Sequence, residues 1–450
     1  MKAGMKLLAA LLVAAALSPL VAQAPQVSEK KDVAIFALGY YGYNIPEQTL
    51  GNIDMEIQKV FVDLGRFNIL GYTQRLSSGG LQEFIETLKK AKEANFSMPE
   101  KYQFGEAILT EADFNKLVGA FIVAAPVVAN FNSSFNSKTG YWETEIKTNV
   151  TFVDVAGGGS VMAIAQITTT GLDKQDENKS ISAAIEGIPM QLQYEIRKIP
   201  AFQINTRILA VSGSEIKMQL GQNMGIQKGD EYSVIVGGMV EGFKDESEKG
   251  LVIIKEVGAE VSTGLVLYSS AKLTKDIQLR EIARLGVDAE PFVHLVSGTK
   301  LDYSGGSSGS NIIIGARVPL TRGFFDMRPF ASLQIPVNGI GTWGTFFMVP
   351  INAIVGAEYN IYLGRLTLAP YAGAGVSYIY AGEATSGTTT DTSDSFFSHY
   401  GAQAYVRVSF LVTRDIKIFA EAGGEYWFAA STIYSTYGGI GYGGGVSLKM

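Results

Sequence analysis

Residues 286–450 alternate between apolar and polar side chains with the period of two that is typical of β-strands. Tyr400–Leu411 is the clearest example. Its apolar face carries Ala402, Ala404, Val406, Val408 and Phe410, and its other face carries Gln403, Tyr405, Arg407 and Ser409. Ile416–Phe428 repeats the pattern, with Ile416, Ile418, Ala420, Ala422 and Tyr426 on one face and Lys417, Glu421 and Glu425 on the other. The spacing predicts two-faced strands and no helix.

Eight strands are predicted in this region. They are Val287–Val296, Asn311–Leu320, Met327–Ile335, Val349–Tyr362, Leu366–Tyr380, Tyr400–Leu411, Ile416–Phe428 and Ile440–Met450. Three connections are tight, at residues 321–326, 364–365 and 413–415. The others are longer and polar, at residues 297–310, 336–346, 381–398 and 429–439. Short turns that alternate with longer loops are typical of bacterial outer-membrane barrels, and an even strand number returns both ends of the barrel to the periplasm.

A closed barrel is also what the membrane requires. Only helices and closed barrels pair every backbone polar group within lipid, and after residue 24 no run of about 18 apolar residues is present. We therefore expect the apolar faces to contact outer-membrane lipid. A one-residue slip would place charges in hydrocarbon at roughly 2–4 kcal/mol for a midplane Lys or Arg, which fixes the register. Aromatic residues near strand ends are predicted to form interfacial girdles: Tyr359, Tyr362, Tyr378, Tyr380, Tyr426 and Trp427.

An eight-stranded barrel is only wide enough for its own side chains to fill it. The charged residues predicted to point inward are Asp288, Glu290, Arg317, Arg328, Glu358, Arg407, Lys417, Glu421 and Glu425. Because unpaired charges in such a lumen are costly, we expect a paired network that plugs it. A small gated ion path is the alternative. His294 is also predicted to point inward, where a hydrogen bond is favoured over a role as a metal ligand.

The chain begins with the pattern of a secretory signal. Residues 1–24 have a basic start, an apolar core too short to span a membrane, and a small-residue ending at Ala24. We expect cleavage after Ala24. Export would place residues 25–285 in the periplasm and the barrel in the bacterial outer membrane.

Residues 32–200 mix strands and helices. Strands are predicted at Asp32–Tyr40, Arg66–Tyr72, within Asp113–Asn130, and at Trp142–Val155 and Ser160–Thr170. Apolar residues at helical spacing predict helices at Pro46–Leu64, Gly80–Asn95 and Ser180–Lys198, the last with Ser180 as its N-cap. The order strand–helix–strand–helix–three strands–helix predicts an α/β sandwich.

Three sequence phrases in this part resemble the curli-secretion (CsgG-like) family. They are VAIFALGYYGYN, GRFNILGYTQRL and YWETEIKTNVTFVDVAGG. The resemblance covers about residues 32–200 and implies the fold shared with lipoprotein activators of penicillin-binding proteins and with the amino-terminal domain of TolB. It further implies an envelope assembly or scaffolding protein that binds other proteins. The chain has no cysteine to lipidate, and a barrel would take over that anchoring role.

Residues 201–285 predict a small β domain. A turn at Lys228–Asp230 leads into a strand, and further strands are predicted at Leu251–Val257, Val261–Tyr268 and Ile277–Arg284. This part weakly resembles the C-terminal β domain of the flagellar protein FlgT. A compact β spacer is the alternative.

Residues 286–450 resemble the small barrels of the OmpA/OmpX type. The resemblance implies the barrel-assembly machinery as a partner during insertion. The chain ends Leu448-Lys449-Met450 rather than with the terminal aromatic residue common in substrates of that machinery.

Composition narrows the chemistry. The chain has no cysteine and two histidines, so disulfides and thiolate chemistry are excluded and a zinc or Ser-His-Asp site is poorly supplied. Loss of Lys2 and Lys6 leaves 35 basic residues against 43 acidic ones, a net charge near −8 that gives no reason to expect nucleic acid. Glu143 with Glu145 is interpreted as a solvated strand edge rather than an acid/base pair. Asp245–Glu248 is interpreted as an acidic loop without the spacing of a calcium site. No catalytic residue, metal or cofactor is predicted.

Together these patterns predict a multi-domain α+β protein. After the signal come a CsgG-like periplasmic α/β sandwich (32–200), a small β domain (201–285) and a C-terminal eight-stranded antiparallel transmembrane β-barrel (286–450). We expect a non-enzymatic outer-membrane protein whose barrel anchors a domain that binds a periplasmic protein in envelope or appendage assembly. Two other functions stay open. One is a surface adhesin or host-factor binder that acts through residues 297–310 and 381–398, and the other is a small gated channel.

Overall fold

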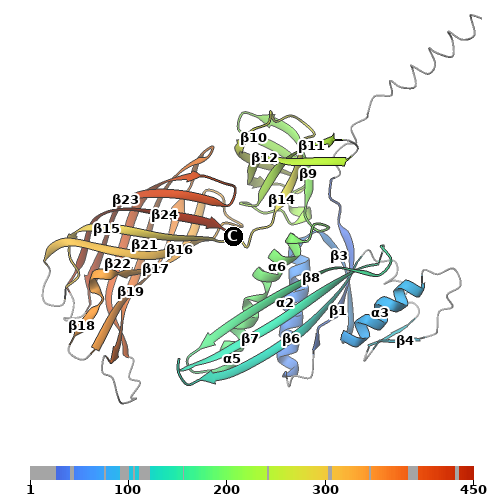
Figure 1. The fold of residues 1–450 in the computed structure, drawn as a ribbon, viewed down its shortest axis with the longest axis horizontal. Coiled ribbons are helices and arrows are strands. Elements are labelled where there is room, and N and C mark those ends of the chain that lie inside the picture. The colour runs from blue at the N-terminus through green and yellow to red at the C-terminus, as the bar shows by residue number, and fades with distance from the viewer. Residues whose placement is uncertain are drawn as a thin grey trace, which may run out of the picture.

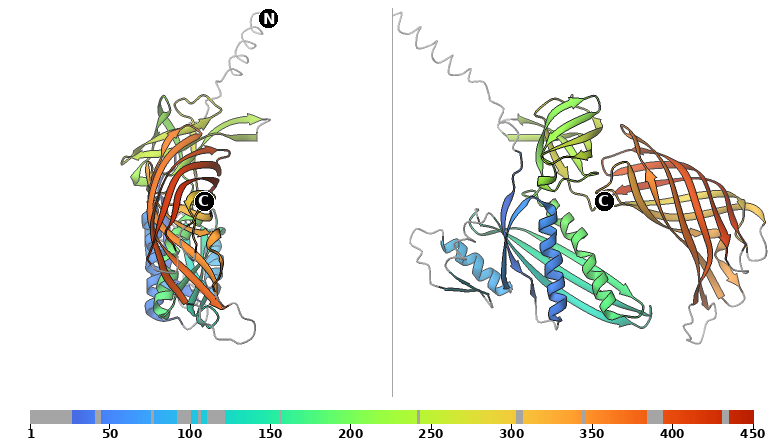
Figure 2. Two further views of the ribbon diagram at one scale, coloured as in Figure 1. Left: turned by 90° about the vertical axis from the view of Figure 1, so that its left-hand side faces the viewer. Right: turned by 180° about the vertical axis from the view of Figure 1, so that it is seen from behind.

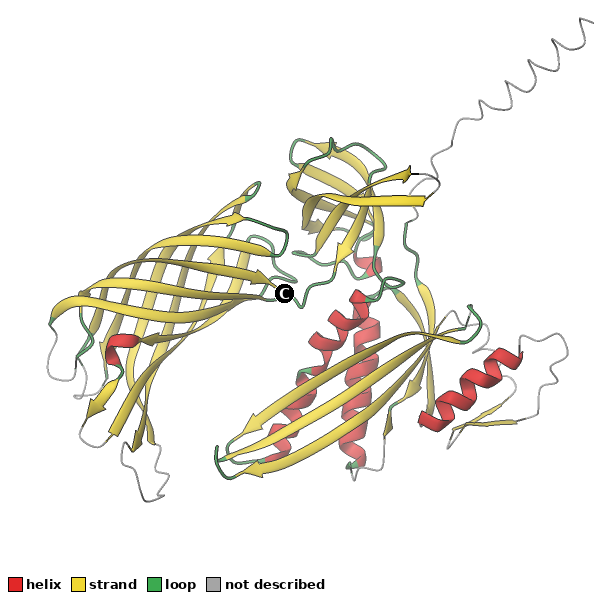
Figure 3. Cartoon of the chain, viewed as in Figure 1, coloured by secondary structure: helices red, strands yellow, loops and turns green. Residues whose placement is uncertain are grey.

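The computed structural model is mostly β, with few helices, and folds into three bodies (Figures 1 and 3). It describes residues 27–40, 45–75, 78–91, 101–104, 107–110, 122–155, 157–240, 243–302, 307–343, 346–383, 394–430 and 435–450. The predicted signal segment and its cleavage site lie outside these ranges, as do residues 113–121 of the third predicted strand and residues 384–393 of the predicted outer loop. None of the helices in the described parts of the chain has both the length and the apolar character that a membrane span requires.

The N-terminal body is built on a twisted sheet whose main path runs β3-β1-β6-β7-β8, with β2 paired to β6. Its strands are β1 (Lys31–Ala37), β2 (Gly39–Tyr40), β3 (Phe67–Arg75), β6 (Ile122–Asn136), β7 (Tyr141–Asp154) and β8 (Ser160–Asp173). The β1 strand runs parallel to β3 and β6, whereas β6, β7 and β8 are antiparallel. A further hairpin, which the sequence pattern does not predict, joins β4 (Lys101–Phe104) to β5 (Ala107–Thr110).

Three helices share a hydrophobic core with this sheet. They are α2 (Glu47–Leu64), α5 (Glu177–Glu186) and α6 (Ile188–Lys198), and α3 (Ser78–Ala91) is a fourth helix of the body. The predicted apolar face of α2 is confirmed, because Leu50, Ile53 and Ile57 are all buried in that core. Gly65 ends α2 in the left-handed conformation, with a φ of 66°.

The helix predicted at Ser180–Lys198 is wrong in its start and in its continuity. Asp176 caps α5 by accepting the backbone N–H of Asn178, and Ser180 lies buried one turn inside. The helix is then interrupted at Gly187, because Pro189 in the first turn of α6 has no N–H to continue the hydrogen bonds of α5. Asp176 is as good a capping residue as Ser180, so residue type alone did not identify the start.

The middle body is a closed six-stranded barrel in the order β10-β13-β12-β11-β14-β9. Its strands are β9 (Asn205–Ser212), β10 (Glu215–Gln219), β11 (Glu231–Val240), β12 (Phe243–Val257), β13 (Val261–Ser269) and β14 (Gln278–Ile282). The predicted acidic loop Asp245–Glu248 is wrong, because these residues form the first part of β12 and pair with β11. Glu246 forms an ion pair with Arg280 and Glu248 with Arg414, so arginines from other elements stabilise these charges within a strand.

The C-terminal body is an antiparallel barrel of eight principal strands, as predicted. They are β15 (Asp288–Thr299), β16 (Ser308–Pro319), β17 (Met327–Pro336), β19 (Phe346–Tyr359), β21 (Leu366–Glu383), β22 (Asp394–Leu411), β23 (Ile416–Ala429) and β24 (Tyr437–Lys449). Pairing of β15 with β24 and of β19 with β21 closes the barrel, and the short strands β18 (Gly341–Trp343) and β20 (Ile361–Leu363) extend two of the hairpins. Figure 2 shows the barrel from two further directions.

Several strands run further than predicted. The β22 strand begins at Asp394 and β21 ends at Glu383, inside the predicted loop 381–398, and β16 begins at Ser308. Hairpin pairing continues there after the apolar alternation stops, because backbone hydrogen bonds do not depend on an apolar outer face. The tight turns at residues 321–326, 364–365 and 413–415 are confirmed.

Two of the six predicted girdle aromatics point elsewhere. Trp427 is fully buried inside the barrel, as the exposure of its neighbour Tyr426 on the outer face requires for alternating side chains. Tyr362 packs on Phe325 and donates a hydrogen bond to that residue's carbonyl oxygen. Tyr359, Tyr378 and Tyr380 are exposed on the outer surface.

Candidate functional site

The barrel lumen is lined by the inward faces of all eight principal strands. On β22, Gln403, Tyr405 and Arg407 are buried, whereas Val406 and Val408 are about half exposed on the outside, at 49% and 50%. This alternation confirms the predicted faces of Tyr400–Leu411. It also places Gln403, Tyr405, Arg407 and Ser409 inside the barrel.

Four of the nine predicted lumen charges form one cluster. Glu290 on β15 accepts from Arg317 on β16 (Nε–Oε2, 2.9 Å) and from Arg407 on β22 (Nη1–Oε2, 2.6 Å). Arg407 also reaches Glu421 on β23 (Nε–Oε2, 2.7 Å), and Arg317 lies 3.8 Å from the same carboxylate oxygen. Two guanidinium groups and two carboxylates therefore balance in charge, and all four residues are buried.

Aromatic side chains and His294 enclose this cluster. His294 on β15 makes a hydrogen bond with Glu421 at 2.5 Å, in agreement with the prediction that this residue is hydrogen-bonded inside the barrel. The guanidinium carbon of Arg317 lies 4.3 Å from the ring centre of Tyr371, and that of Arg407 lies 3.8 Å from the ring centre of Phe419. Such cation–π contacts gain strength away from water.

The other five predicted lumen residues have different neighbours. Lys417 pairs with Asp288 at 3.4 Å, and the Lys417 side chain is more exposed than those of the central cluster. Glu358 accepts a hydrogen bond from Asn360 (2.9 Å), and Glu425 accepts one from the indole of Trp427 (3.3 Å). The guanidinium carbon of Arg328 lies 5.9 Å from the ring centre of Tyr362. The structure thus divides the predicted set into one central cluster and separate smaller contacts.

Neutral polar side chains also meet in the lumen, among them Gln403, which the sequence places on the inward face of its strand. Gln334 on β17 donates to Gln403 on β22 at 3.0 Å, and Asn352 on β19 bonds Tyr437 on β24 at 2.8 Å. Gln334 and Asn352 lie at inward positions of predicted strands, so the alternation could have identified them. Tyr437 lies in the predicted loop 429–439, whereas in the structure it begins β24. The predicted lumen set contained only charged residues and therefore did not include these neutral side chains.

A second group of buried charges joins the N-terminal body to the six-stranded barrel. Glu281 on β14 binds Arg66, just after α2, through two hydrogen bonds of 2.7 and 3.1 Å, and Arg197 of α6 at 2.7 Å. Burial alone would raise the pKa of Glu281, but the two guanidinium groups outweigh it and hold the pKa below its ordinary value. Arg197 also reaches Asp230 at 3.0 Å.

Asp230 extends this group to the C-terminal barrel. Its carboxylate accepts a hydrogen bond from Arg322 in the tight turn between β16 and β17, at 3.1 Å. Burial, together with the nearby charge of Arg197, lowers the pKa of Arg322 from its ordinary value, although Asp230 opposes this. Beside this group, the backbones of the N-terminal and middle bodies also approach each other closely, since a Cβ on Gly225 would lie 1.9 Å from the carbonyl oxygen of Leu64.

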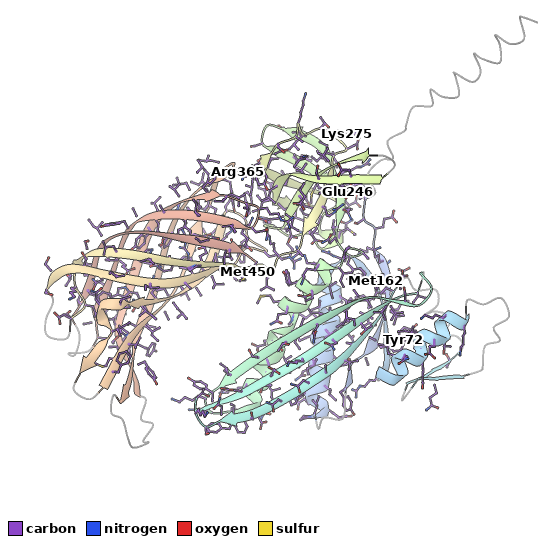
Figure 4. All side chains as sticks on the ribbon, viewed as in Figure 1. Tyr72, Met162, Glu246, Lys275, Arg365 and Met450 are labelled. Atoms are coloured by element: carbon purple, nitrogen blue, oxygen red, sulfur yellow. The ribbon has the colours of Figure 1, made fainter. Side chains whose placement is uncertain are left out.

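Further contacts join the two barrels. Glu231 forms ion pairs with Arg284 (3.1 Å) and with Lys449. The guanidinium carbon of Arg365, labelled in Figure 4, lies 3.8 Å from the ring centre of Tyr268 on β13. An apolar cluster fills the space beside these contacts, with Leu251, Ile253, Leu267 and Ile282 from the middle body and Phe325 and Leu411 from the C-terminal body.

No metal site is evident in the described residues, where no three His, Asp or Glu side chains are placed to share an ion. The two strand carboxylates Glu143 and Glu145 lie partly exposed on β7. Glu143 accepts from Asn136 at 2.9 Å, and Glu145 pairs with Lys147 at 3.2 Å. Each of the two carboxylates therefore has its own partner.

Comparison with known proteins adds little to this geometry. No protein-family model matches the sequence. A search of curated proteins also returns no match. Among solved structures, the chain is similar to neisserial surface protein A at 14% identity, over 37% of this chain and 97% of that one, with a TM-score of 0.28. It is similar to Ail, the attachment invasion locus protein of Yersinia pestis, at 13% identity over 37% and 99%, with a TM-score of 0.23.

The N-terminal β-barrel domain of OprF from Pseudomonas aeruginosa is a third similar structure, at 13% identity over 36% of this chain and 96% of that one, with a TM-score of 0.22. Similarities at these TM-scores carry no argument about function. The barrel assignment rests instead on the strand pairing described above. The resemblances of residues 32–200 to the CsgG-like family and of residues 201–285 to FlgT stay predictions.

Proposed function

We propose that this chain is a non-enzymatic protein of the bacterial outer membrane. Its eight-stranded barrel anchors the two preceding bodies on the periplasmic side, where they bind a protein partner in envelope or appendage assembly. The observation that carries the proposal is the reversal of chemistry across the barrel wall, with apolar side chains outside and balanced charges inside.

The outer surface of the barrel supports the membrane location. Val406, Val408 and Phe410 on β22 are exposed, as are Ile416 and Ile418 on the neighbouring β23. A water-soluble protein rarely exposes a continuous apolar patch larger than a few hundred Å². A lipid environment removes that cost, because the exposed side chains then contact hydrocarbon.

Fractionation of cells that express the full chain tests this location. We expect the chain to stay with the outer membrane after washing at alkaline pH and to need detergent for extraction. Recovery of the folded chain in buffer without detergent would contradict the proposal.

The filled lumen supports an anchor rather than a conduit. Arg407 links Glu290 to Glu421 across the barrel, with Tyr371 and Phe419 packed on the guanidinium groups. We expect the full chain in planar bilayers to show no conductance above that of lipid alone. A variant that carries both Arg317→Ala and Arg407→Ala is the positive control, because it opens space and leaves the two carboxylates without partners. Steady ion conductance by the unmodified chain would favour the channel instead.

Partner binding is supported by the size of the exported part and by its attachment to the anchor. Residues 27–282 are joined to the barrel by the buried pairs that Asp230 and Glu231 form with Arg322 and Lys449. Photo-cross-linkers placed at exposed sites such as Val62 and Val211 in living cells test this role. We expect attachment of a periplasmic protein from at least one site, and its absence from every site would refute the role.

A further inference from the structure

We propose that β8 is a strand-addition site, at which an extended, uncharged segment of the periplasmic partner pairs with the free edge of the N-terminal sheet. This inference rests on the proposed function, because it names the surface and the chemistry by which that partner binds. Met162, labelled in Figure 4, lies on this strand.

One long edge of β8 has no strand of the described residues beside it. The sheet order ends at β8, which pairs with β7 on one side, and no other described strand pairs with it. In an antiparallel sheet about half of the residues of an edge strand direct their backbone N–H and C=O groups outward. With 14 residues, β8 offers a ladder long enough to hold a partner strand in register.

From Ala163 to Leu172 the β8 edge lacks the usual protection, and the one register shift in its pairing with β7 lies before that run, between Val161 and Ala163. Natural edge strands are commonly protected by lysine, proline, a bulge or extreme shortness. Residues 160–172 contain no charged residue and no proline, and they are rich in β-branched side chains. The opposite edge strand, β3, is nine residues long and carries Arg75 at its end, and its pairing with β1 is irregular near that end. The two barrels close on themselves and therefore leave no comparable edge in the described residues.

The side chains of β8 define the kind of segment that fits. Ala165, Ile167 and Thr169 are buried against the helices, so they are not available to a partner. On the other face Ile164 and Leu172 are 59% and 62% exposed, and only neutral polar residues lie between them.

Cross-strand neighbours stabilise a sheet when their chemistry matches. A partner segment therefore fits with apolar or β-branched side chains opposite Ile164 and Leu172 and with hydroxyl or amide side chains between them. A charge on the segment would find no counter-ion on β8 itself, because the charges on this face, Glu143, Glu145 and Lys147, lie one strand further away on β7.

Register-resolved cross-linking tests the inference in the intact chain. A photo-cross-linking residue is placed at Gln166, Thr168 or Thr170, one position at a time, in cells that express the full protein. These positions share the exposed face of β8. Because side chains on one face of a strand repeat every two residues, strand addition predicts that the attached residue on the partner shifts by two for each step. The attached residues should fall within one uncharged segment.

Charge placed on the edge supplies the matched comparison. Ile164→Lys introduces a charge beside the partner strand, whereas Val62→Lys introduces it at a similarly exposed site, at 64%, on the helix α2. We expect Ile164→Lys to lower cross-linking from Thr168 by about tenfold, because lysine protects an edge against pairing. The Val62→Lys variant should cross-link as the parent does, and circular dichroism of both variants verifies that the fold is kept.

Several outcomes would overturn strand addition. They are equal cross-linking by the two lysine variants, attachment points scattered over unrelated segments, and attachment to residues 160–173 of a second copy of this chain. If partners attach at Val62 or Val211 but never along β8, partner binding stands and strand addition fails. If no position attaches a partner, both fail together.

Discussion

Replacement of Val406 by arginine is the sharpest test of the membrane assignment. Val406 lies on the outer face of β22, opposite Pro370 on β21 and Ala422 on β23. It precedes Leu411, which ends the strand next to the tight turn 413–415, by five positions. With a rise of about 3.4 Å per residue and a tilt of about 40°, each position adds roughly 2.6 Å along the barrel axis. Val406 is therefore about 13 Å from that end, near the middle of an apolar band about 25 Å tall.

A charge at this depth should be expensive. Arginine at the midplane of an outer-membrane barrel costs about 2–4 kcal/mol, and the cost falls to about 0–1 kcal/mol near the interfaces. We expect Val406→Arg to lower the free energy of unfolding of the full chain by that larger amount in lipid vesicles. Urea titration followed by tryptophan fluorescence measures it, since Trp427 is buried in the barrel.

Two control variants separate depth from the chemistry of arginine. Val412→Arg places the charge at the rim of the barrel, where Val412 is exposed beyond the end of β22. Val211→Arg places it on the exposed surface of the six-stranded barrel. Both should cost less than about 1 kcal/mol. Equal costs at Val406, Val412 and Val211 would mean that the outer face of the barrel does not lie in hydrocarbon.

Three further changes test the buried charges and the junction. Arg407→Met leaves two buried carboxylates with one guanidinium, and it should lower the free energy of unfolding by about 3–5 kcal/mol in urea titrations in vesicles. Arg414→Met, which breaks an exposed ion pair, should lower it by less than about 1 kcal/mol. Equal costs would count against the cluster. The pKa of Glu281 is lowered on folding, so its stabilisation is complete above about pH 4.3 and is lost as the pH falls toward the folded value. Urea midpoints of the full chain should therefore drop on acidification from about pH 6 to pH 3, and Glu281→Gln should flatten that drop; an unchanged slope would refute the assignment. Gly225→Ala should destabilise the full chain more than Gly213→Ala does. Both glycines have a positive φ, which alone costs alanine about 1–2 kcal/mol. Only a Cβ on Gly225 would also meet backbone, because it would lie 1.9 Å from the carbonyl oxygen of Leu64 at the end of α2.

The sequence predicts the barrel well because lipid makes one face of every strand apolar. The alternation in Tyr400–Leu411 and Ile416–Phe428 identified both the strands and their inward residues. Strand ends were predicted less well, since β21 and β22 continue beyond the apolar belt. Beyond the membrane the outer face of a strand contacts water, so no change from apolar to polar side chains marks the residue at which pairing stops.

The grouping of the lumen charges was beyond the reach of the pattern. Alternation says that Glu290, Arg407 and Glu421 point inward, but which of them meet depends on how the strands are staggered around the barrel. The stagger places Arg407 directly opposite Glu421 on the neighbouring strand. It brings Glu290 to the same level from another strand, 117 positions away in the chain. No local signal carries that information.

The buried charges around Glu281 and Asp230 were unpredictable for a related reason. Their loss should also have a different effect from loss of the lumen cluster. Arg66 and Glu281 are 215 positions apart, so neither residue signals the other in the sequence. The lumen cluster lies within one body, and its loss should weaken the barrel alone. The group around Glu281 and Asp230 is shared by three bodies, and its loss should instead free the N-terminal sheet from the anchor while the barrel stays folded. A partner strand on β8 would then still bind, but the membrane would no longer fix its direction.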